Sequence, residues 1–342
     1  MSGKLSIVIV NWNSKDHLRR CLESIESTCA DYSPKVIVVD GASFDGCAEM
    51  LTDSFPAVTF VQSLHNIGFG RCNNLGFTEV QTDEVLLLNP DTELKPGAVA
   101  RLCRVLDDMP DAGIVSPRLL NSDGSLQTSC VQAVPTPLNQ ALDCEFLRNL
   151  FPGSRLWGTA EAFRAKSPLE VEVLSGACMA MRSETFRKMG GFREEFFMYG
   201  EDVDLCHRVR RSGLRNIFVP DAEVVHHGGG SSTNLGSGFS AAMQRVAMGT
   251  YFHLNGSNAA AASYRFLQAA SALVRLALLS LRLILSSRAR RVRIGASAHK
   301  WMTVLKWAFG GNLTVPGHYP NVVGPAEAAG AIGFDERHIQ VK

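Results

Sequence analysis

Three carboxylates lie within four residues of the chain, at Glu201, Asp202 and Asp204. An aromatic run that ends in a glycine, residues 196–200, precedes them. Carboxylates this close together repel one another in a half-apolar setting, which favours metal binding, a raised pKa or strong hydrogen bonding. A solvated helix start is the alternative, because acidic side chains also interact favourably with the N-terminal end of a helix. Taken alone, the cluster supports both interpretations.

A second acidic position lies far upstream, where an apolar run at residues 86–88 ends and Asp91 follows. One carboxylate at a strand end, together with a distant carboxylate cluster, is what a metal-assisted group transfer requires. The histidines His226 and His227 follow a predicted strand and precede a glycine run. From the residues alone, either histidine is more typical of a surface or core position than of a metal site.

Apolar segments with the spacing of strands and helices alternate through the first third of the chain. Strands are predicted at residues 5–10, 36–39, 58–61 and 85–88, and helices at 15–28, 45–55 and 73–80. This alternation predicts a doubly wound, mostly parallel α/β sheet. Ligands bind beyond the carboxyl ends of the strands in such sheets. Because Asn11, Asp40, Asn66 and Asp91 follow those ends, we expect one ligand site along this edge.

The rest of the chain predicts a second half and a helical end. Residues 121–168 are Pro-rich and irregular, and we expect them to cover the site. A strand is predicted at 171–181, helices at 183–189 and 203–212, and short strands at 217–219 and 224–225. We expect one domain over residues 1–240, divided near residue 118 into two halves. A helical region follows at 241–342.

The segment 266–285 is strongly apolar but carries a narrow polar stripe of Gln268, Ser271, Arg275, Arg282 and Ser286. In a membrane-spanning helix the apolar residues would contribute roughly 3 to 7 kcal/mol, and two central arginines would cost about 5 to 7 kcal/mol. Spanning is therefore disfavoured. Two alternatives stay open: a helix lying on the bilayer beside the arginines at 288–293, or a hairpin packed on the domain.

Composition excludes several classes of protein. A net charge of +1 over 342 residues argues against nucleic acid as a partner. Nine cysteines without a C-x-x-C pair indicate reduced thiols and neither a disulfide framework nor a zinc site. A strand follows directly on the first four residues, which predicts no secretory signal. We therefore expect a cytoplasmic protein.

Five segments of the chain are informative together: residues 6–13, 38–46, 66–76, 88–92 and 200–205. They occur in the order found in family 2 glycosyltransferases, and the chain resembles that family over roughly residues 5–232. The nearest resemblance is to the rhamnosyltransferase-like branch that builds bacterial surface polysaccharides. The resemblance implies a GT-A fold, a nucleotide-sugar donor, a divalent metal ion and inversion at the anomeric carbon.

Donor-binding residues are assigned beside this resemblance. Asp40 can accept a hydrogen bond from a pyrimidine N–H, and Asn11 and Asn13 can hold the base and ribose. A glycine-containing segment resembles the family's donor-binding turn and supplies the remaining candidates, Asn66, Gly68, Gly70, Asn73 and Asn74.

The metal site is implied by the same resemblance. Asp91 matches the second acid of the family's D-x-D motif, whereas Asn89, a further donor-site candidate, stands where the first acid is usual. A site of hard oxygen ligands favours Mg²⁺ or Mn²⁺, with the donor diphosphate completing the shell. The family places a histidine at His226, with His227 as the alternative. An imidazole ligand favours manganese somewhat.

Direct displacement is the chemistry that follows. The motif places the general base at Asp202, with Glu201 as the alternative, and we assign Tyr199 and Asp204 to the acceptor side. We expect an inverting enzyme that transfers a sugar, preferably rhamnose from dTDP-rhamnose, to a saccharide or polyprenyl-diphosphate-linked acceptor. Peripheral contact with the inner face of the cell membrane is open.

Three competing functions are weighed against this one. A catalytically silent sugar-nucleotide-binding protein is supported only by Asn89. A processive polysaccharide synthase would require a Q-x-x-R-W motif and several spanning helices, which the sequence lacks. A nucleotidyltransferase would require a glycine-rich, basic loop after the first strand, and residues 11–14 contain no glycine.

Overall fold

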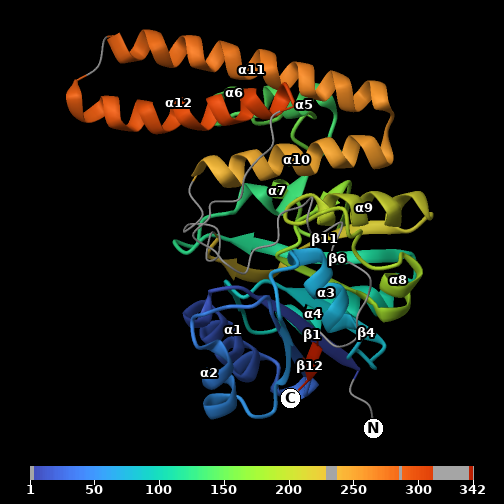
Figure 1. Ribbon diagram of the computed structural model, residues 1–342. Coiled ribbons are helices and arrows are strands. Elements are labelled where there is room, and N and C mark those ends of the chain that lie inside the picture. Colours follow the sequence, from blue (N-terminus) through green and yellow to red (C-terminus); the bar gives the residue numbers. More distant parts are fainter. Residues whose placement is uncertain (1–3, 229–236, 285–286, 311–338, 342) are drawn as a thin grey trace.

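A computed structural model describes residues 4–228, 237–284, 287–310 and 339–341 of the chain (Figure 1). A ten-stranded sheet has the order β12-β3-β2-β1-β4-β10-β6-β11-β5, with β8 paired to β11. The helices α10, α11 and α12 lie together at one end of the molecule, beyond the sheet (Figure 1).

The N-terminal half of the sheet is parallel, as the alternating pattern predicts. Its strands are β1 (Leu5–Asn11), β2 (Lys35–Asp40), β3 (Thr59–Ser63) and β4 (Glu84–Leu88), with β1 between β2 and β4. Every residue of β1 and β4 is buried, which is why both read as continuous apolar runs. The connecting helices are α1 (Lys15–Thr28), α2 (Cys47–Ser54) and α3 (Phe69–Phe77).

The second half adds strands of both directions. The strand β10 (Cys178–Arg182) runs antiparallel between β4 and β6 (Ala112–Leu120), and β11 (Arg215–His226) is parallel to β6. On the edges lie β5 (Thr92–Leu94), β8 (Leu169–Val171) and, beside β3, β12 (Ile339–Val341). The helices here are α4 (Ala98–Asp108), α8 (Ser183–Lys188) and α9 (Glu201–Arg211). This mixed sheet confirms the predicted fold class.

Two strand predictions differ from the structure. The predicted strand 171–181 is broken at residues 175–177, where β9 (Val173–Leu174) leaves the main sheet to pair with β7 (Val131–Gln132). At this break the backbone N–H groups of Ser175 and Gly176 do not pair with a strand of the main sheet. The strands predicted at 217–219 and 224–225 form the single strand β11, with a register shift between Val219 and Glu223.

The Pro-rich insertion folds into short elements. They are η2 (Thr128–Cys130), α5 (Pro137–Leu142), α6 (Glu145–Leu150) and α7 (Ala160–Arg164). The helix α5 begins with a capping box, in which Thr136 and Asn139 satisfy each other's backbone N–H groups. This segment forms one side of the catalytic cavity.

The C-terminal region consists of α10 (Ser237–Asn255), α11 (Asn258–Ile284) and α12 (Arg288–Ala308). The polar stripe of α11 faces α5: Gln268 donates to the carbonyl of Gln140 (3.1 Å) and Arg275 donates to that of Asp143 (3.3 Å). These carbonyls lie at the end of α5, where helical partners run out. The first part of the stripe, Gln268, Ser271 and Arg275, is thus a packing surface, whereas Arg282 is exposed and Ser286 lies outside the described residues. Through this surface α11 packs against the domain.

The opposite face of α11 is exposed and apolar, with Phe266, Leu273, Val274, Leu278 and Leu281 accessible to solvent. By length and composition, α11 is the one helix among the described residues that could cross a membrane, and 17% of its apolar stretch is buried. Three of the four predicted arginines, Arg288, Arg290 and Arg293, have side chains outside the described residues.

Candidate active site

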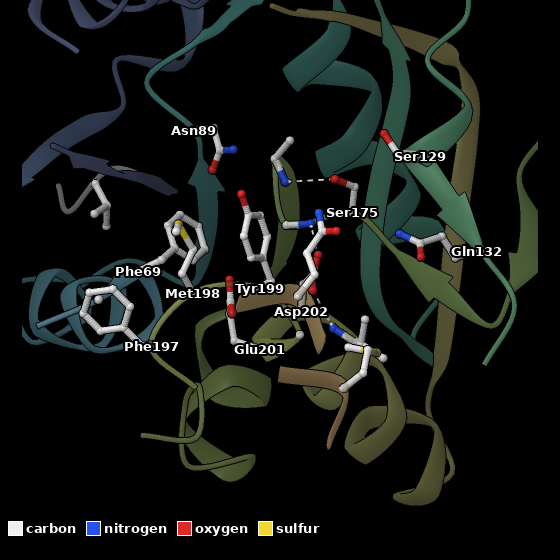
Figure 2. Close-up of a pocket in the computed structure, with 18 of the residues that line it drawn as sticks. Phe69, Asn89, Ser129, Gln132, Ser175, Phe197, Met198, Tyr199, Glu201 and Asp202 are labelled. Carbon is white, nitrogen blue, oxygen red and sulfur yellow. Dashed lines mark hydrogen bonds between the residues drawn. The ribbon is translucent and has the colours of Figure 1, made fainter. Parts of the chain in front are cut away.

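A cavity of 590 Å³ opens at the carboxyl ends of β1 and β4 and lies against the N-terminal turn of α9. Asn66, Asn89 and Asp91 line it from the N-terminal half, and Glu201 and Asp202 line it from α9. Figure 2 shows Tyr199, Glu201 and Asp202 pointing toward the space between them and Asn89. Asp91 and the pair Glu201 and Asp202 are more than a hundred residues apart in the sequence, and they line the same cavity.

The side chain of Asp202 is held by two backbone N–H groups. Its Oδ2 atom accepts from Gly176 (2.9 Å) and its Oδ1 atom accepts from Val203 (2.8 Å). Gly176 lies in the break between β9 and β10, and a β-carbon there would meet the Asp202 Cβ at 3.2 Å. The carboxylate is thus fixed in orientation by a close backbone approach that a glycine permits.

The neighbouring carboxyl has a different environment. Glu201 is buried, and its Oε2 atom has no hydrogen-bond partner among the described residues. Burial, and next the charge of Asp202, raise the pKa of Glu201 to about 8. Burial also raises the pKa of Asp202, but the N–H groups of Gly176 and Val203 oppose that rise. Asp202 is therefore the member that ionises first, while Glu201 holds its proton near neutral pH.

Asn89, Asp91 and His226 converge on one point at the opposite side of the cavity. The Asp91 Oδ1 and His226 Nε2 atoms are 3.3 Å apart, and the Asn89 amide nitrogen lies 3.5 Å from the same Nε2. The antiparallel pairing of β11 with β5 places His226 opposite Thr92, the residue after Asp91. Sheet register brings these three side chains together.

The hydrogen bonds of His226 set the direction of its lone pair. Gln127 donates through its amide nitrogen to Asn121 and to the His226 carbonyl, so its oxygen is left to accept from His226 Nδ1 at 2.7 Å. With the proton on Nδ1, the Nε2 lone pair points toward the Asp91 carboxylate. Outer partners fix metal-binding histidines in this manner.

This donor set fits a divalent cation. A carboxylate oxygen and an imidazole lone pair that face each other are compatible when a cation lies between them, and the buried Asn89 Oδ1 has no other partner among the described residues. No group of three or more His, Cys, Asp or Glu side chains that could hold a metal occurs within the described parts of the chain. The protein would therefore supply a partial shell, which a bound diphosphate could complete.

His227, the alternative histidine, is engaged elsewhere. Its Nε2 atom is 2.8 Å from Glu93 Oε1 and its Nδ1 atom is 2.7 Å from Ser122 Oγ. Both ring nitrogens are used by protein groups outside the cavity lining. The geometry therefore favours His226 as the metal ligand.

Three predicted donor residues, Asn11, Asn13 and Asp40, lie together beside the cavity without lining it. Asn11 donates to Asp40 Oδ1 (3.0 Å), and Asp40 Oδ2 accepts from the backbone N–H of Ser43 and from Gln62 (2.8 Å each). Asp40 is thus buried among protein donors. Trp12 and Gly41, which we did not single out, line the cavity at this position.

The predicted donor turn divides into two groups. Asn66 and Gly68 line the cavity, whereas Gly70, Asn73 and Asn74 do not. At Gly68, where φ is +91°, a β-carbon would lie 2.3 Å from the carbonyl oxygen of Phe197. The absence of a side chain at Gly68 therefore leaves room for the backbone of residues 196–200, which precede Glu201.

The other three residues contact protein groups, and their role in donor binding stays a prediction. Both side-chain amide atoms of Asn74 bind the backbone of Phe192, at 2.8 and 2.9 Å. Asn73 is buried and donates to the carbonyl of Phe69. A β-carbon on Gly70 would touch the Phe192 side chain at 3.1 Å. Asn74 and Gly70 thus join α3 to Phe192, whereas the Asn73 side chain binds within α3.

The two acceptor-side predictions have different outcomes. Tyr199 lines the cavity, with a left-handed backbone at φ 70°. Asp204 is completely buried outside the lining, where it accepts from Arg208 (2.7 Å), Arg193 (3.1 Å) and Asn255 (2.8 Å). The geometry gives no support to acceptor contact by Asp204, which stays a prediction. Its charge is neutralised by two arginines, and it holds α9 against the end of α10.

The insertion and the C-terminal helices supply cavity residues that we did not predict, namely Gln140, Arg148, Gln244, Arg245, Met248 and Gln268. No local pattern marks these positions, because arginine and glutamine are ordinary residues of exposed helix faces. The helix α10 touches the catalytic segment directly, since a β-carbon on Gly200 would meet the Met248 Cε at 3.0 Å. The helical region is thus part of the site.

Comparisons with known proteins agree with this geometry. Residues 3–246 match the family described as glycosyltransferase-like family 2. The chain is 31% identical over 240 residues to N-acetylglucosaminyl-diphospho-decaprenol L-rhamnosyltransferase of Mycobacterium tuberculosis, covering 66% of this chain and 77% of that protein. It is 23% identical over 235 residues to rhamnosyltransferase WbbL of Escherichia coli, covering 65% and 82%.

A solved structure supports the fold. Mannosyltransferase PcManGT from Pyrobaculum calidifontis, in complex with GDP-Man and Mn²⁺, superposes with a TM-score of 0.54 at 17% identity, over 90% of this chain and 87% of that one. This similarity shows the GT-A fold.

Proposed function

The chain belongs to glycosyltransferase-like family 2, and on that premise we propose that it transfers rhamnose, with inversion, from dTDP-rhamnose to a polyprenyl-diphosphate-linked sugar. The observation that carries the proposal is the pairing of Asp202, held by two N–H groups, with the convergent Asn89, Asp91 and His226 in one cavity. The rhamnosyltransferase relatives support the sugar, and the name of the mycobacterial relative supports the acceptor class.

Asp202 would act as the general base. As the acceptor oxygen attacks the anomeric carbon, its proton passes to a carboxylate oxygen of Asp202 and the bond to the nucleoside diphosphate breaks on the opposite face. Such a single displacement inverts the anomeric configuration. Glu201, protonated near neutral pH, keeps a second negative charge away from Asp202.

Mg²⁺ or Mn²⁺ held by Asn89, Asp91 and His226 would stabilise the charge that develops on the departing diphosphate. Tyr199, on the same side of the cavity as Asp202, offers a ring face to the acceptor sugar. The Gly176 N–H keeps Asp202 in one orientation before the acceptor arrives. In this scheme Asp202 acts on the acceptor, and the metal site acts on the departing diphosphate.

The exposed apolar face of α11 is proposed to contact the cytoplasmic face of the membrane. Phe266, Val274, Leu278 and Leu281 are exposed side chains of α11. This helix lies at the end of the molecule where α5 and α6 also lie (Figure 1). A contiguous apolar patch on a surface helix is typical of an interaction site. A membrane contact here would present the cavity to a lipid-linked substrate.

The test is transfer by the purified chain from a panel of nucleotide sugars, with Mg²⁺, with Mn²⁺ and with chelator. The acceptor is N-acetylglucosamine linked through a diphosphate to a short alkyl chain. We expect transfer of rhamnose from dTDP-rhamnose, and NMR of the product should show the inverted linkage. Transfer of another sugar would overturn the donor assignment, and binding of nucleotide sugars without transfer or hydrolysis would favour a silent binding protein.

A further inference from the structure

The cavity continues from the catalytic carboxylates to a wall that the helical region builds. Arg148 of α6 and Arg245 of α10 line this wall. Arg245 precedes Met248 by three residues and therefore lies on the same face of α10, about one turn away. Met248 contacts Gly200, the residue before Glu201. The Arg245 guanidinium thus lies one helical turn from the contact with the catalytic segment.

The Arg245 side chain is incompletely satisfied. Its Nη1 atom donates to the carbonyl of Ala241 in its own helix (2.9 Å), but its buried Nε–H has no partner among the described residues. Within the described part of the chain, no carboxylate forms an ion pair with it. A buried guanidinium without a counter-charge is unfavourable unless something else supplies the negative charge.

Two more cations accompany Arg245 around a single indole. The Trp301 ring centroid lies 5.4 Å from the Arg245 guanidinium, 4.1 Å from that of Arg275 and 5.7 Å from the Lys300 ammonium. We call Arg245, Arg275 and Lys300 the tryptophan-centred cation cluster. Burial lowers the pKa of each, and for Lys300 the charges of the two arginines lower it further.

One carboxylate lies near the cluster. The Asp143 side chain acts electrostatically on Arg245 and Arg275, but it already accepts a 2.6 Å hydrogen bond from Arg148. Within the described part of the chain, Asp143 is the one carboxylate that acts on Arg148, Arg245 and Arg275. This end of the cavity favours an anion that carries more than one charge.

An apolar hollow adjoins the same arginine. Arg148 stacks on the Trp157 ring at 5.2 Å, and Trp157 lines a second cavity together with Leu142, Leu147, Phe151 and Leu156. The order from the catalytic carboxylates outward is thus a polar cavity, a cationic wall and an apolar hollow. A sugar, a diphosphate and a hydrocarbon chain are joined in the same order in a lipid-linked acceptor.

We infer, resting on the proposed function, that Arg148 and Arg245 bind the diphosphate of the lipid-linked acceptor, that Arg275 and Lys300 add positive charge from outside the cavity lining, and that the hollow beside Trp157 receives the start of its hydrocarbon chain. The insertion, through Arg148, and the helical region, through Arg245, then select the acceptor by its charge. Charged donors that bind a phosphate oxygen strengthen an interaction more than neutral ones do.

Two acceptor probes test this inference. One is N-acetylglucosamine linked through a diphosphate to a short alkyl chain, and the other is the alkyl glycoside of the same sugar without the diphosphate. The wild type should prefer the diphosphate probe by about ten-fold or more in kcat/KM, the range expected for hydrogen bonds to charged groups. Arg245→Gln and Arg148→Gln change the two arginines that line the cavity, and each should lower this ratio several-fold.

Two further variants make the result specific. Arg245→Lys keeps the charge and should retain part of the preference, whereas Arg282→Gln changes an exposed arginine of α11 outside the cavity lining and should leave the ratio unchanged. The KM for the nucleotide-sugar donor should stay constant in all four variants. Thermal unfolding of each variant separates loss of function from loss of fold.

The outcomes distinguish the two proposals. Equal use of both probes by the wild type would leave the proposed function standing and overturn the acceptor subsite. A raised donor KM in Arg245→Gln would assign the cluster to the donor diphosphate and also overturn it. An equal loss of activity on both probes in Arg245→Gln would overturn the acceptor subsite too. Failure of the wild type to transfer any sugar to either probe would overturn the proposed function itself.

Discussion

The backbone N–H of Gly176 donates a 2.9 Å hydrogen bond to the Oδ2 atom of Asp202, across a break between two strands. Together with the N–H of Val203, this bond opposes the rise that burial causes in the pKa of Asp202. Its partner Glu201 has no comparable donor at Oε2 among the described residues. Two adjacent carboxyl groups therefore differ in what opposes the rise that burial causes in their pKa.

Asp202→Asn should lower kcat by about a hundred-fold to ten-thousand-fold, the range typical of a lost general base. The affinity for the nucleoside diphosphate should change by no more than a few-fold, since Asp202 acts on the acceptor. Steady-state kinetics and calorimetric titration with the nucleotide check the two parts. Retained turnover, or an equal loss of nucleotide affinity, would transfer the base to Glu201.

Gly176→Ala should disturb Asp202 without touching the metal site. The new methyl group would lie 3.2 Å from the Asp202 Cβ, so the carboxylate must move and its bond from the N–H must weaken. A weaker bond leaves the pKa of Asp202 higher, so the acidic limb of the kcat/KM profile should shift to higher pH. Gly295→Ala is the matched control, because no heavy atom lies within 4 Å of the added carbon and this exposed residue of α12 lines neither cavity. An unchanged profile would show that the Gly176 contact is without consequence.

The buried Glu201 should make the protein less stable as pH rises. Its folded pKa of about 8 exceeds the ordinary value of 4.5, so between these values the folded state keeps a proton that the unfolded state has lost. The free energy of unfolding should then fall by up to about 1.4 kcal/mol per pH unit from this group. Urea unfolding at pH 5, 6.5 and 8 measures the slope. Glu201→Gln should flatten it, and the same slope in the variant would place its origin elsewhere.

Asp91→Asn and His226→Gln should weaken divalent-metal binding and donor affinity together, because the ion would join the protein to the diphosphate. His227→Gln serves as the control, since its ring nitrogens bind Glu93 and Ser122. Asn89→Asp should tighten metal binding by adding a charged oxygen. Titration of Mn²⁺ with the nucleoside diphosphate present measures all four variants. Full activity in excess chelator would show that the reaction proceeds without a metal ion.

The outer face of α11 should bind acidic phospholipid vesicles. Leu278→Glu combined with Leu281→Glu places two charges on exposed apolar positions, and should release much of the protein without altering donor hydrolysis. Replacing the arginines at 288, 290, 291 and 293 should weaken binding most at low salt, with each contributing about 1 kcal/mol near an anionic surface. Co-sedimentation with vesicles is the measurement. If the intact protein ignores acidic vesicles even at low salt, the face has another partner.

Local patterns in the sequence predict the N-terminal fold well. The strands β1, β2, β3 and β4 lie within one or two residues of their predicted bounds, because buried parallel strands are continuous apolar runs. The helix predicted at residues 203–212 is found as α9, which starts two residues earlier, at Glu201. Five ordered segments identify the family. The residues predicted to bind the donor and the metal follow the ends of the predicted strands. All of this depends on residues that are neighbours along the chain.

Other features were decided only by tertiary packing. Asp204 shares the acidic cluster of Glu201 and Asp202, yet it faces Arg193 and Arg208 inside the protein because the helix turns its side chain away from the cavity. Asn74 sits in a donor-like turn but holds the catalytic segment through Phe192. Neighbouring residues on a helix face different directions, and the sequence does not say which direction will meet a partner.

The choice of His226 over His227 and the cationic wall have the same origin. Pairing of β11 with β5 sets which histidine reaches Asp91, and a shift of one residue would exchange them. The cationic wall forms because α10, α11 and α12 bring Arg245, Arg275 and Lys300 to Trp301. The sequence by itself determined the family, the sheet and the residues able to do chemistry. Only the tertiary structure decided which of them meet, because such contacts depend on sheet register and helix packing between distant segments, which no local pattern encodes.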